Sequence, residues 1–312
     1  MATEFKHISV LLEECIDGLM IKPDGIYVDG TLGGGGHSNE ILKRLTTGRL
    51  VAIDKDEEAI IHSSERLKDY KDKITYIQDD FKNIEEILES LKINQIDGAL
   101  IDLGVSSYQI DNGERGFSYM QDAPLDMRMN QSQYLTAFNV VNEYSEGELI
   151  KIITNYGDER FAKNIAANIV REREKQSIRT TGQLSNIVEH SIPTAFRWKY
   201  GNPCKRTFQA IRIEVNDELG NLDKAVNSFV EHLKSKGRMC VITFHSEEDR
   251  IVKRALKELA TGCTCDKSLP VCVCGRKEKI KFVVNKAVLP TEDEQTANPR
   301  SKSAKLRIIE KI

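Results

Sequence analysis

The chain has 312 residues, of which 40% are hydrophobic and 30% are charged. This composition excludes a disordered polymer and can supply the cores of about two domains. No apolar run approaches the roughly 18 residues of a membrane span, and the first residues, MATEFKHISVLLEE, are too charged for a signal peptide. We therefore expect a soluble, cytoplasmic protein. Its net charge of −3 does not by itself indicate nucleic-acid binding.

The first third of the chain alternates short apolar runs with helical patterns. Strands are predicted at 26–29, 50–54, 74–77 and 97–102, and helices at 36–46, 56–67 and 83–91. Strands separated by helices of this length predict right-handed βαβ units and a parallel sheet.

The pattern changes after residue 110. The predicted later elements are helices with capping boxes at Ser145–Glu148 and Thr180–Gln183, a helical stretch over 205–233 broken at Gly220, a strand at 238–243, a helix at 247–259, and strands at 282–284 and 306–309. We therefore predict an α/β fold in which residues 1–110 and 206–312 form a discontinuous core. Residues 111–205 would form an inserted helical domain.

Basic residues are concentrated in one part of the chain. Residues Arg160 to Arg212 include eleven Lys/Arg and three Asp/Glu, a local net charge of +8. Because the whole chain has a net charge of −3, the remaining residues together carry −11. This block is either a surface that faces phosphates or a set of helices with solvated basic faces.

A glycine-rich loop, DGTLGGGGHS from Asp29 to Ser38, follows a predicted strand and opens a helix. Glycines let a ligand approach the backbone closely, and ligands of open α/β sheets bind at this carboxyl edge. Asp54 ends the next predicted strand, where its carboxylate could accept hydrogen bonds from both ribose hydroxyls of a nucleoside.

Two cofactors suit a glycine loop between a strand and a helix with an acid at the end of the next strand. NAD calls for G-x-G-x-x-G, but Ser38 or Asn39 stands where the third glycine would fall. The acid Asp29 is unfavourable beside a pyrophosphate and suits the amino group or sulfonium of S-adenosylmethionine. The residues thus favour S-adenosylmethionine over NAD, with a purely structural glycine turn as a third alternative.

Two further residues follow strands of the same predicted edge. Phe81 could pack on adenine, and Asp102 would lie near the transferable methyl group. Each also has an ordinary alternative, since Phe81 could be a core residue and Asp102 a helix cap or turn former.

Together these motifs resemble those of the RsmH family, also called MraW. The matching segments, from His7 to Ile308, are HISVLLEE, DGTLGGGGHS, AIDKD, IDLGVSS, ERGFS, PLDMRM, YGDERFAKNIA, RTFQAIRIEVN, FHSEEDRIVK and NPRSKSAKLRI. The resemblance implies a class I (Rossmann-like) S-adenosylmethionine-dependent methyltransferase core with an inserted helical domain. It also implies methylation of a cytosine N4 in the decoding region of 16S rRNA. We expect this rRNA to be the partner within the small ribosomal subunit, with naked rRNA as the alternative, and we expect no DNA or membrane partner. The oligomeric state is not readable.

The resemblance also implies site residues. The implied cofactor contacts are Gly35, Gly36, His37, Asp54, Phe81, Asp102 and Gln109. Arg128 and Arg206 would hold phosphates. Trp198 could stack a base, the alternative being a packing residue, and His37 could contribute only its backbone while its side chain stabilises the loop.

Methyl transfer to a cytosine amine requires that the reacting atoms are aligned and that a hydrogen-bond acceptor is present for the amine. A cytosine amine is a poor nucleophile, so nitrogen and methyl carbon must be aligned at about 3–3.5 Å, and the amine must lose a proton. Asp102 or a neighbouring backbone carbonyl could accept this hydrogen bond, with Ser106 and Ser107 nearby in sequence.

His245, just after the predicted strand at 238–243, could face the target base. Alternatively, His245 belongs to a turn in which Ser246 caps the next helix and Asp249 completes a capping box.

Two rival functions remain open from the sequence. One is a non-catalytic RNA-binding factor for ribosome assembly that keeps the methyltransferase fold. The other is an NAD-dependent oxidoreductase, which the glycine spacing disfavours.

Four cysteines are clustered near the C-terminal end, at Cys263, Cys265, Cys272 and Cys274. Four thiolates suit tetrahedral zinc, although C-x-C is tighter than the usual spacing of two to four residues. The alternative is a reduced, cysteine-rich loop.

Overall fold

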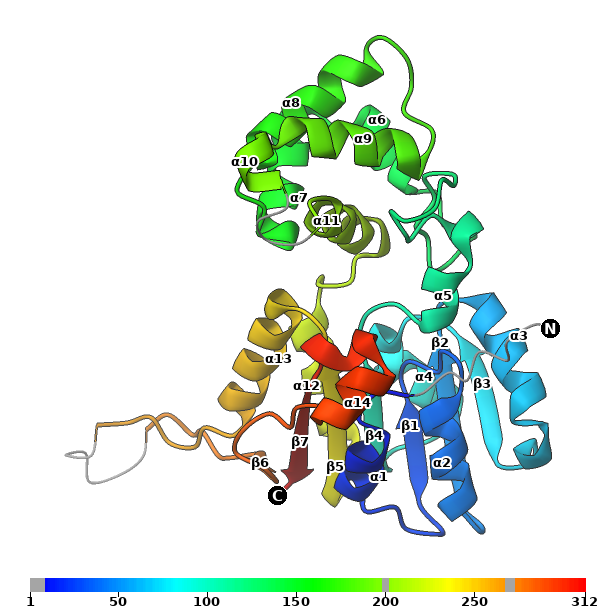
Figure 1. Cartoon of the computed structure of the whole chain (residues 1–312). Coiled ribbons are helices and arrows are strands. Elements are labelled where there is room, and N and C mark those ends of the chain that lie inside the picture. The colour runs from blue at the N-terminus through cyan, green and yellow to red at the C-terminus, as the bar shows by residue number, and fades with distance from the viewer. Residues whose placement is uncertain (1–8, 198–201, 267–272) are drawn as a thin grey trace. The chain divides into compact units, whose positions relative to one another are not determined.

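The computed structural model describes residues 9–197, 202–266 and 273–312. It divides into two compact units (Figure 1). Unit 1 comprises the residues up to Gly104 together with Asn221–Ile312, and unit 2 is Val105–Gly220. Within the described ranges, no helix combines the length and apolarity that a membrane crossing requires.

Unit 1 is built on a seven-stranded sheet in the order β3-β2-β1-β4-β5-β7-β6. Its strands are β1 (Ile26–Asp29), β2 (Arg49–Asp54), β3 (Ile74–Gln78), β4 (Ile96–Asp102), β5 (Leu233–Thr243), β6 (Ile280–Phe282) and β7 (Lys305–Lys311). Strands β1 to β5 are parallel, and β7 runs antiparallel between β5 and β6. The predicted α/β class and parallel sheet are confirmed.

Helices cover both faces of this sheet. The helices of unit 1 are α1 (Leu12–Leu19), α2 (Gly36–Arg44), α3 (Glu57–Arg66), α4 (Ile84–Ser90), α12 (Leu222–His232), α13 (Ser246–Leu259) and α14 (Glu292–Ala297). Helices α1 and α2 lie on the near side of the strands in Figure 1, over a core that includes Leu19, Ile41 and Cys240. Helix α12 packs against α4 and α13. Because both faces are covered, every residue of β4 is buried except Asp102, which is half-buried.

Several element bounds differ from the sequence prediction. Helix α1 was not predicted, because its N-cap, Leu11, has no capping side chain. Strand β5 begins at Leu233, five residues before the predicted strand, because polar residues at 234–238 form an irregular stretch opposite Ile96 to Gly98. Strand β6 ends at Phe282, where the predicted strand begins.

Unit 2 is helical, and its described residues contribute only an isolated β-bridge between Pro124 and Thr180. Its helices are α5 (Ser107–Asp111), α6 (Ala137–Glu143), α7 (Glu146–Gly157), α8 (Ala162–Arg173), α9 (Thr181–Ser191), α10 (Thr194–Arg197) and α11 (Cys204–Asn216). Both predicted capping boxes are present, at α7 and α9.

Both boundaries between the units differ from the prediction: the first falls earlier, after Gly104 and not after residue 110, and the second falls later, after Gly220. The sequence placed residues from 206 onward in the core, whereas helix α11 belongs to unit 2. Its residues Phe208, Ile211 and Val215 join the core that α7, α8 and α9 form. An amphipathic pattern shows that one face of a helix is buried but does not identify the elements that bury it. The periodicity of α11 therefore could not show to which unit the helix belongs.

Gly48, just before β2, marks a close approach of two backbone segments. A Cβ there would lie 2.3 Å from the Gly25 carbonyl oxygen and 2.9 Å from the Gly25 nitrogen. We expect Gly48→Ala to lower the free energy of unfolding by about 1–3 kcal/mol, because backbone cannot yield as a side chain can. Gly147→Ala in α7 is the matched control, since its Cβ would meet nothing within 4 Å. Equal urea midpoints for the two variants would refute this reading.

Candidate functional site

The loop between β1 and α2 is held by the carboxylate of Asp54. Gly33 N–H donates to Asp54 Oδ2 at 2.8 Å, and Asp56 N–H donates to Asp54 Oδ1 at 2.9 Å. Gly33 and Gly35 have φ values of 48° and 72°, in the left-handed region. The tetraglycine run is therefore used for its backbone conformation.

Helix α3 holds the same loop from its other side. Ser63 Oγ donates to the Gly33 carbonyl and Arg66 Nη1 donates to the Gly34 carbonyl, both at 2.7 Å. A Cβ on Gly35 would lie 3.1 Å from Ser63 Oγ. Sequence reasoning missed both donors, since these contacts span 30 and 32 residues and have no local signature.

Asp29, at the end of β1, lies beneath the loop and is 1% exposed. Its Oδ1 accepts from Thr31 N–H at 3.1 Å, and its Oδ2 accepts from Ser38 Oγ at 2.7 Å. Burial raises the pKa of Asp29 to about 6, against the lowering effect of these hydrogen bonds. Burial likewise raises the pKa of Asp54 to about 6.

Asp102 ends β4 at the same edge. Its backbone N–H donates to Thr31 Oγ1 at 2.6 Å. Its Oδ1 is buried, and no group among the described residues donates a hydrogen bond to it. Burial, followed by the charges of Asp29 and Glu248, raises the pKa of Asp102 well above its usual value. The Asp102 side chain as a whole is 24% exposed, so the carboxylate is partly accessible at this edge.

His37 is buried in the first turn of α2. Its Nε2 lies 3.1 Å from the Val10 carbonyl oxygen, and its Nδ1 lies 3.9 Å from Asp102 Oδ2. These contacts favour the alternative in which the imidazole stabilises the loop, and a cofactor contact by His37 stays a prediction.

Phe81 opens a short 3-10 helix, Phe81–Asn83, after β3 and is 8% exposed. A Cβ on Gly30 would lie 3.1 Å from Phe81 Cβ, so the phenylalanine packs beside the start of the glycine loop. Asp80, just before it, pairs with Lys55 at 2.7 Å. The structure thus brings Phe81 to the edge where Asp54 lies, as the sequence predicted.

His245 is the N-cap of α13, which corrects the predicted turn. Its Nδ1 accepts from Glu248 N–H at 3.5 Å, and Glu248 Oε2 accepts from the His245 N–H at 3.2 Å. The predicted N-cap at Ser246, with Asp249 completing the capping box, was wrong. The helix begins one residue earlier, so that His245 is the N-cap and Glu248 completes the box. Asp249 instead pairs with Arg307 on β7 at 2.7 Å. A catalytic role for His245 stays a prediction.

Gln109 belongs to unit 2, whereas the residues described above belong to unit 1. It is buried in α5, where its Oε1 accepts from Ser106 N–H at 3.0 Å in a capping box. Its proposed contact with a cofactor stays a prediction.

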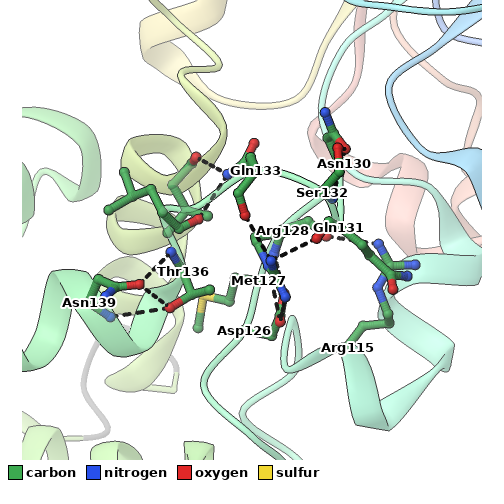
Figure 2. Close-up of polar contacts among 12 residues, drawn as sticks. Arg115, Asp126, Met127, Arg128, Asn130, Gln131, Ser132, Gln133, Thr136 and Asn139 are labelled. Atoms are coloured by element: carbon green, nitrogen blue, oxygen red, sulfur yellow. Dashed lines mark hydrogen bonds and ion pairs between the residues drawn. The ribbon is translucent and has the colours of Figure 1, made fainter.

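Arg128, a predicted phosphate contact, is engaged within its own loop (Figure 2). Its Nε and Nη2 donate to the Asp126 carboxylate at 2.7–3.1 Å. Its Nη1 donates to the carbonyls of Gln131 and Gln133 at 2.7 and 2.8 Å. These contacts favour a structural role, and the phosphate contact stays a prediction.

The remaining predicted residues are spread over both units. Arg206, 41% exposed, donates to the Asp158 carbonyl at 3.3 Å and lies 3.8 Å from Glu159. Trp198 and Cys272 lie outside the described residues. The other cysteines of the cluster lie between α13 and β6.

Strand order, the antiparallel β7 and the pinned glycine loop together define a class I (Rossmann-like) methyltransferase core with a helical insertion. The chain belongs to the MraW methylase family, whose model matches residues 4–312.

Curated relatives match nearly the whole chain. It is 56% identical over 310 residues to the ribosomal RNA small subunit methyltransferase H of Clostridium botulinum (strain Kyoto / Type A2), covering 99% of this chain and 100% of that one. It is 52% identical to the protein of the same name from Lachnospira eligens, over 99% of this chain and 98% of the relative. A solved rRNA methylase from Streptococcus thermophilus aligns over 98% of both chains, with 13% identity and a TM-score of 0.43.

The buried charge of Asp29 predicts a pH-dependent stability. Its pKa is about 6 when folded and near 3.8 when unfolded, so the folded state binds more protons between these values. The stability contribution of this group is therefore greatest below about pH 4, and it falls by about 3 kcal/mol in total as the pH rises from below 4 through the folded pKa of about 6. Asp29→Asn removes this loss, so its free energy of unfolding relative to wild type should increase from pH 4 to pH 7.

Urea denaturation across this pH range measures the difference. Asp24→Asn, at an exposed acid, is the control and should track wild type at every pH. A flat difference between Asp29→Asn and wild type would contradict the assigned pKa.

Proposed function

We propose that this chain transfers the methyl group of S-adenosylmethionine to the N4 amine of a cytosine in 16S rRNA. The observation that carries the proposal is the pinned loop of a methyltransferase core in a chain 56% identical, end to end, to a ribosomal RNA small subunit methyltransferase H. The cytosine N4 target and its place in the decoding region rest on the family resemblance.

The residues at the sheet edge fit this cofactor. Each Asp54 oxygen accepts one backbone N–H in the structure and has a lone pair left for a ribose hydroxyl. Phe81, beside Gly30, supplies an apolar surface for an adenine. The carboxylates of Asp29 and Asp102 supply negative charge where the cofactor carries an amino group and a sulfonium.

The chain's contribution to the reaction is positioning and proton acceptance. The cofactor supplies a methyl group already activated on a sulfonium. The loop, fixed by Asp54, Ser63 and Arg66, holds that group in one orientation. The Asp102 carboxylate, whose side chain is 24% exposed, accepts a hydrogen bond from the amine, and its raised pKa makes it a better proton acceptor than an ordinary carboxylate. His245 is the second candidate catalytic residue, proposed to face the target base.

The proposed substrate is RNA in which the target base can leave its stack. An unpaired nucleotide does this at low cost, and unpaired RNA is where sequence is usually recognised. The basic block of unit 2, with Arg206 and Trp198, is the proposed recognition surface. The proposal places the enzyme in the cytoplasm, acting on the small ribosomal subunit.

The Asp54 carboxylate makes a sharp test of the cofactor site. Asp54→Ala should weaken S-adenosylmethionine binding by about 1–3 kcal/mol, roughly 5- to 150-fold in Kd, through lost charged hydrogen bonds. Isothermal titration calorimetry measures it. The control is Asp69→Ala, which removes an exposed acid on the 3-10 helix Lys68–Tyr70. Unchanged affinity in Asp54→Ala would exclude the ribose contact.

One assay separates the proposed function from its rivals. The protein is incubated with labelled S-adenosylmethionine and small ribosomal subunits that lack the modification, and the RNA is digested to nucleosides. Label in N4-methylcytosine is the expected result, and Asp102→Asn should reduce its rate of appearance. Binding of subunits without transfer would favour a non-catalytic assembly factor. Failure to bind the cofactor would reopen the oxidoreductase reading.

A further inference from the structure

Three cysteines converge in the segment that joins α13 to β6. The Sγ atoms of Cys263, Cys265 and Cys274 all lie within 4.8 Å of one another. The Sγ atoms of Cys263 and Cys274 are 3.7 Å apart. That distance is much longer than the roughly 2.05 Å of a disulfide. It matches the edge of a tetrahedral zinc-thiolate site, about 3.8 Å for zinc–sulfur bonds of about 2.3 Å.

The segment has little apolar packing to bring these thiols together. Each described residue between Ala260 and Lys279 is exposed or half-buried, and Val273 is 77% exposed. The segment is closed at its base, where Lys279 N–H donates to the Leu259 carbonyl at 2.9 Å. Long connections without secondary structure of their own are uncommon in compact domains and are often functional, and a metal bound by the three thiols would cross-link this one.

The ligand chemistry narrows the candidates for that cross-link. Thiolates select zinc and other soft metals over magnesium or calcium. Two of the thiols are exposed and the third is half-buried, so a metal can reach them from solvent. Binding replaces a thiol proton on each sulfur with a metal–sulfur bond, and the protons are released to solvent.

We propose that Cys263, Cys265 and Cys274 bind one zinc ion that holds the segment between α13 and β6. Cys272, the remaining cysteine of this segment, lies outside the described residues. The site is in unit 1 but in none of the elements that carry the glycine loop, so zinc binding and methyl transfer can be tested separately.

Metal content is the direct test. The full chain is purified under reducing conditions without chelator, incubated with zinc and desalted, and its zinc is measured by mass spectrometry. We expect about one equivalent in wild type and loss of most of it in the double variant Cys263→Ser/Cys274→Ser. Thr264→Ser, between two of the ligands and exposed, is the matched control and should keep its zinc.

Thiol reactivity gives a second readout that does not depend on the serine variants folding. In the zinc-loaded protein, alkylation of Cys263, Cys265 and Cys274 should be slow, and a chelator should make it fast. Folded wild type with less than about a tenth of an equivalent after zinc incubation would overturn the proposal. So would equal zinc in the double variant, alkylation indifferent to chelator, or a Cys263–Cys274 disulfide under reducing conditions.

Discussion

The hydrogen bond from Gly33 N–H to Asp54 Oδ2 joins the glycine loop to the end of the neighbouring strand. The loop leaves β1, and the carboxylate that fixes it comes from β2. Ser63 and Arg66 on α3 then occupy the carbonyls of Gly33 and Gly34. Because these anchors come from the next βα unit, the loop keeps its shape only when the parallel sheet is assembled. The proposed cofactor site therefore depends on the sheet edge as a whole.

This arrangement concentrates acids in a poorly solvated place. Burial raises the pKa values of Asp29, Asp54 and Asp102, which means that their ionised forms cost stability in the free protein. A ligand with an amino group, a sulfonium and ribose hydroxyls would recover part of that cost on binding. In the proposed function, the stability lost by burying these acids would favour a cationic, nucleoside-containing ligand over others.

Much of this core is readable from the sequence, because strand periodicity, glycine spacing and the acids after strands are local signals. The anchors are not: Ser63 and Arg66 meet the loop only through tertiary packing. The sequence also did not predict His245 as the N-cap of α13, because the residues favoured at an N-cap are Ser, Thr, Asp and Asn. Likewise, the pattern of α11 predicts an apolar face but not which unit buries it.

The central claim is that the loop held by Asp54 cradles the methyl donor. A crystal structure of the full chain with S-adenosylhomocysteine tests it most directly. We expect the ribose hydroxyls of the ligand to donate hydrogen bonds to the Asp54 carboxylate and its amino-acid portion to lie against the backbone at Gly33–Gly35. We also expect the loop conformation to be unchanged. Density for the ligand elsewhere, or a loop that releases Asp54 to admit it, would contradict the account.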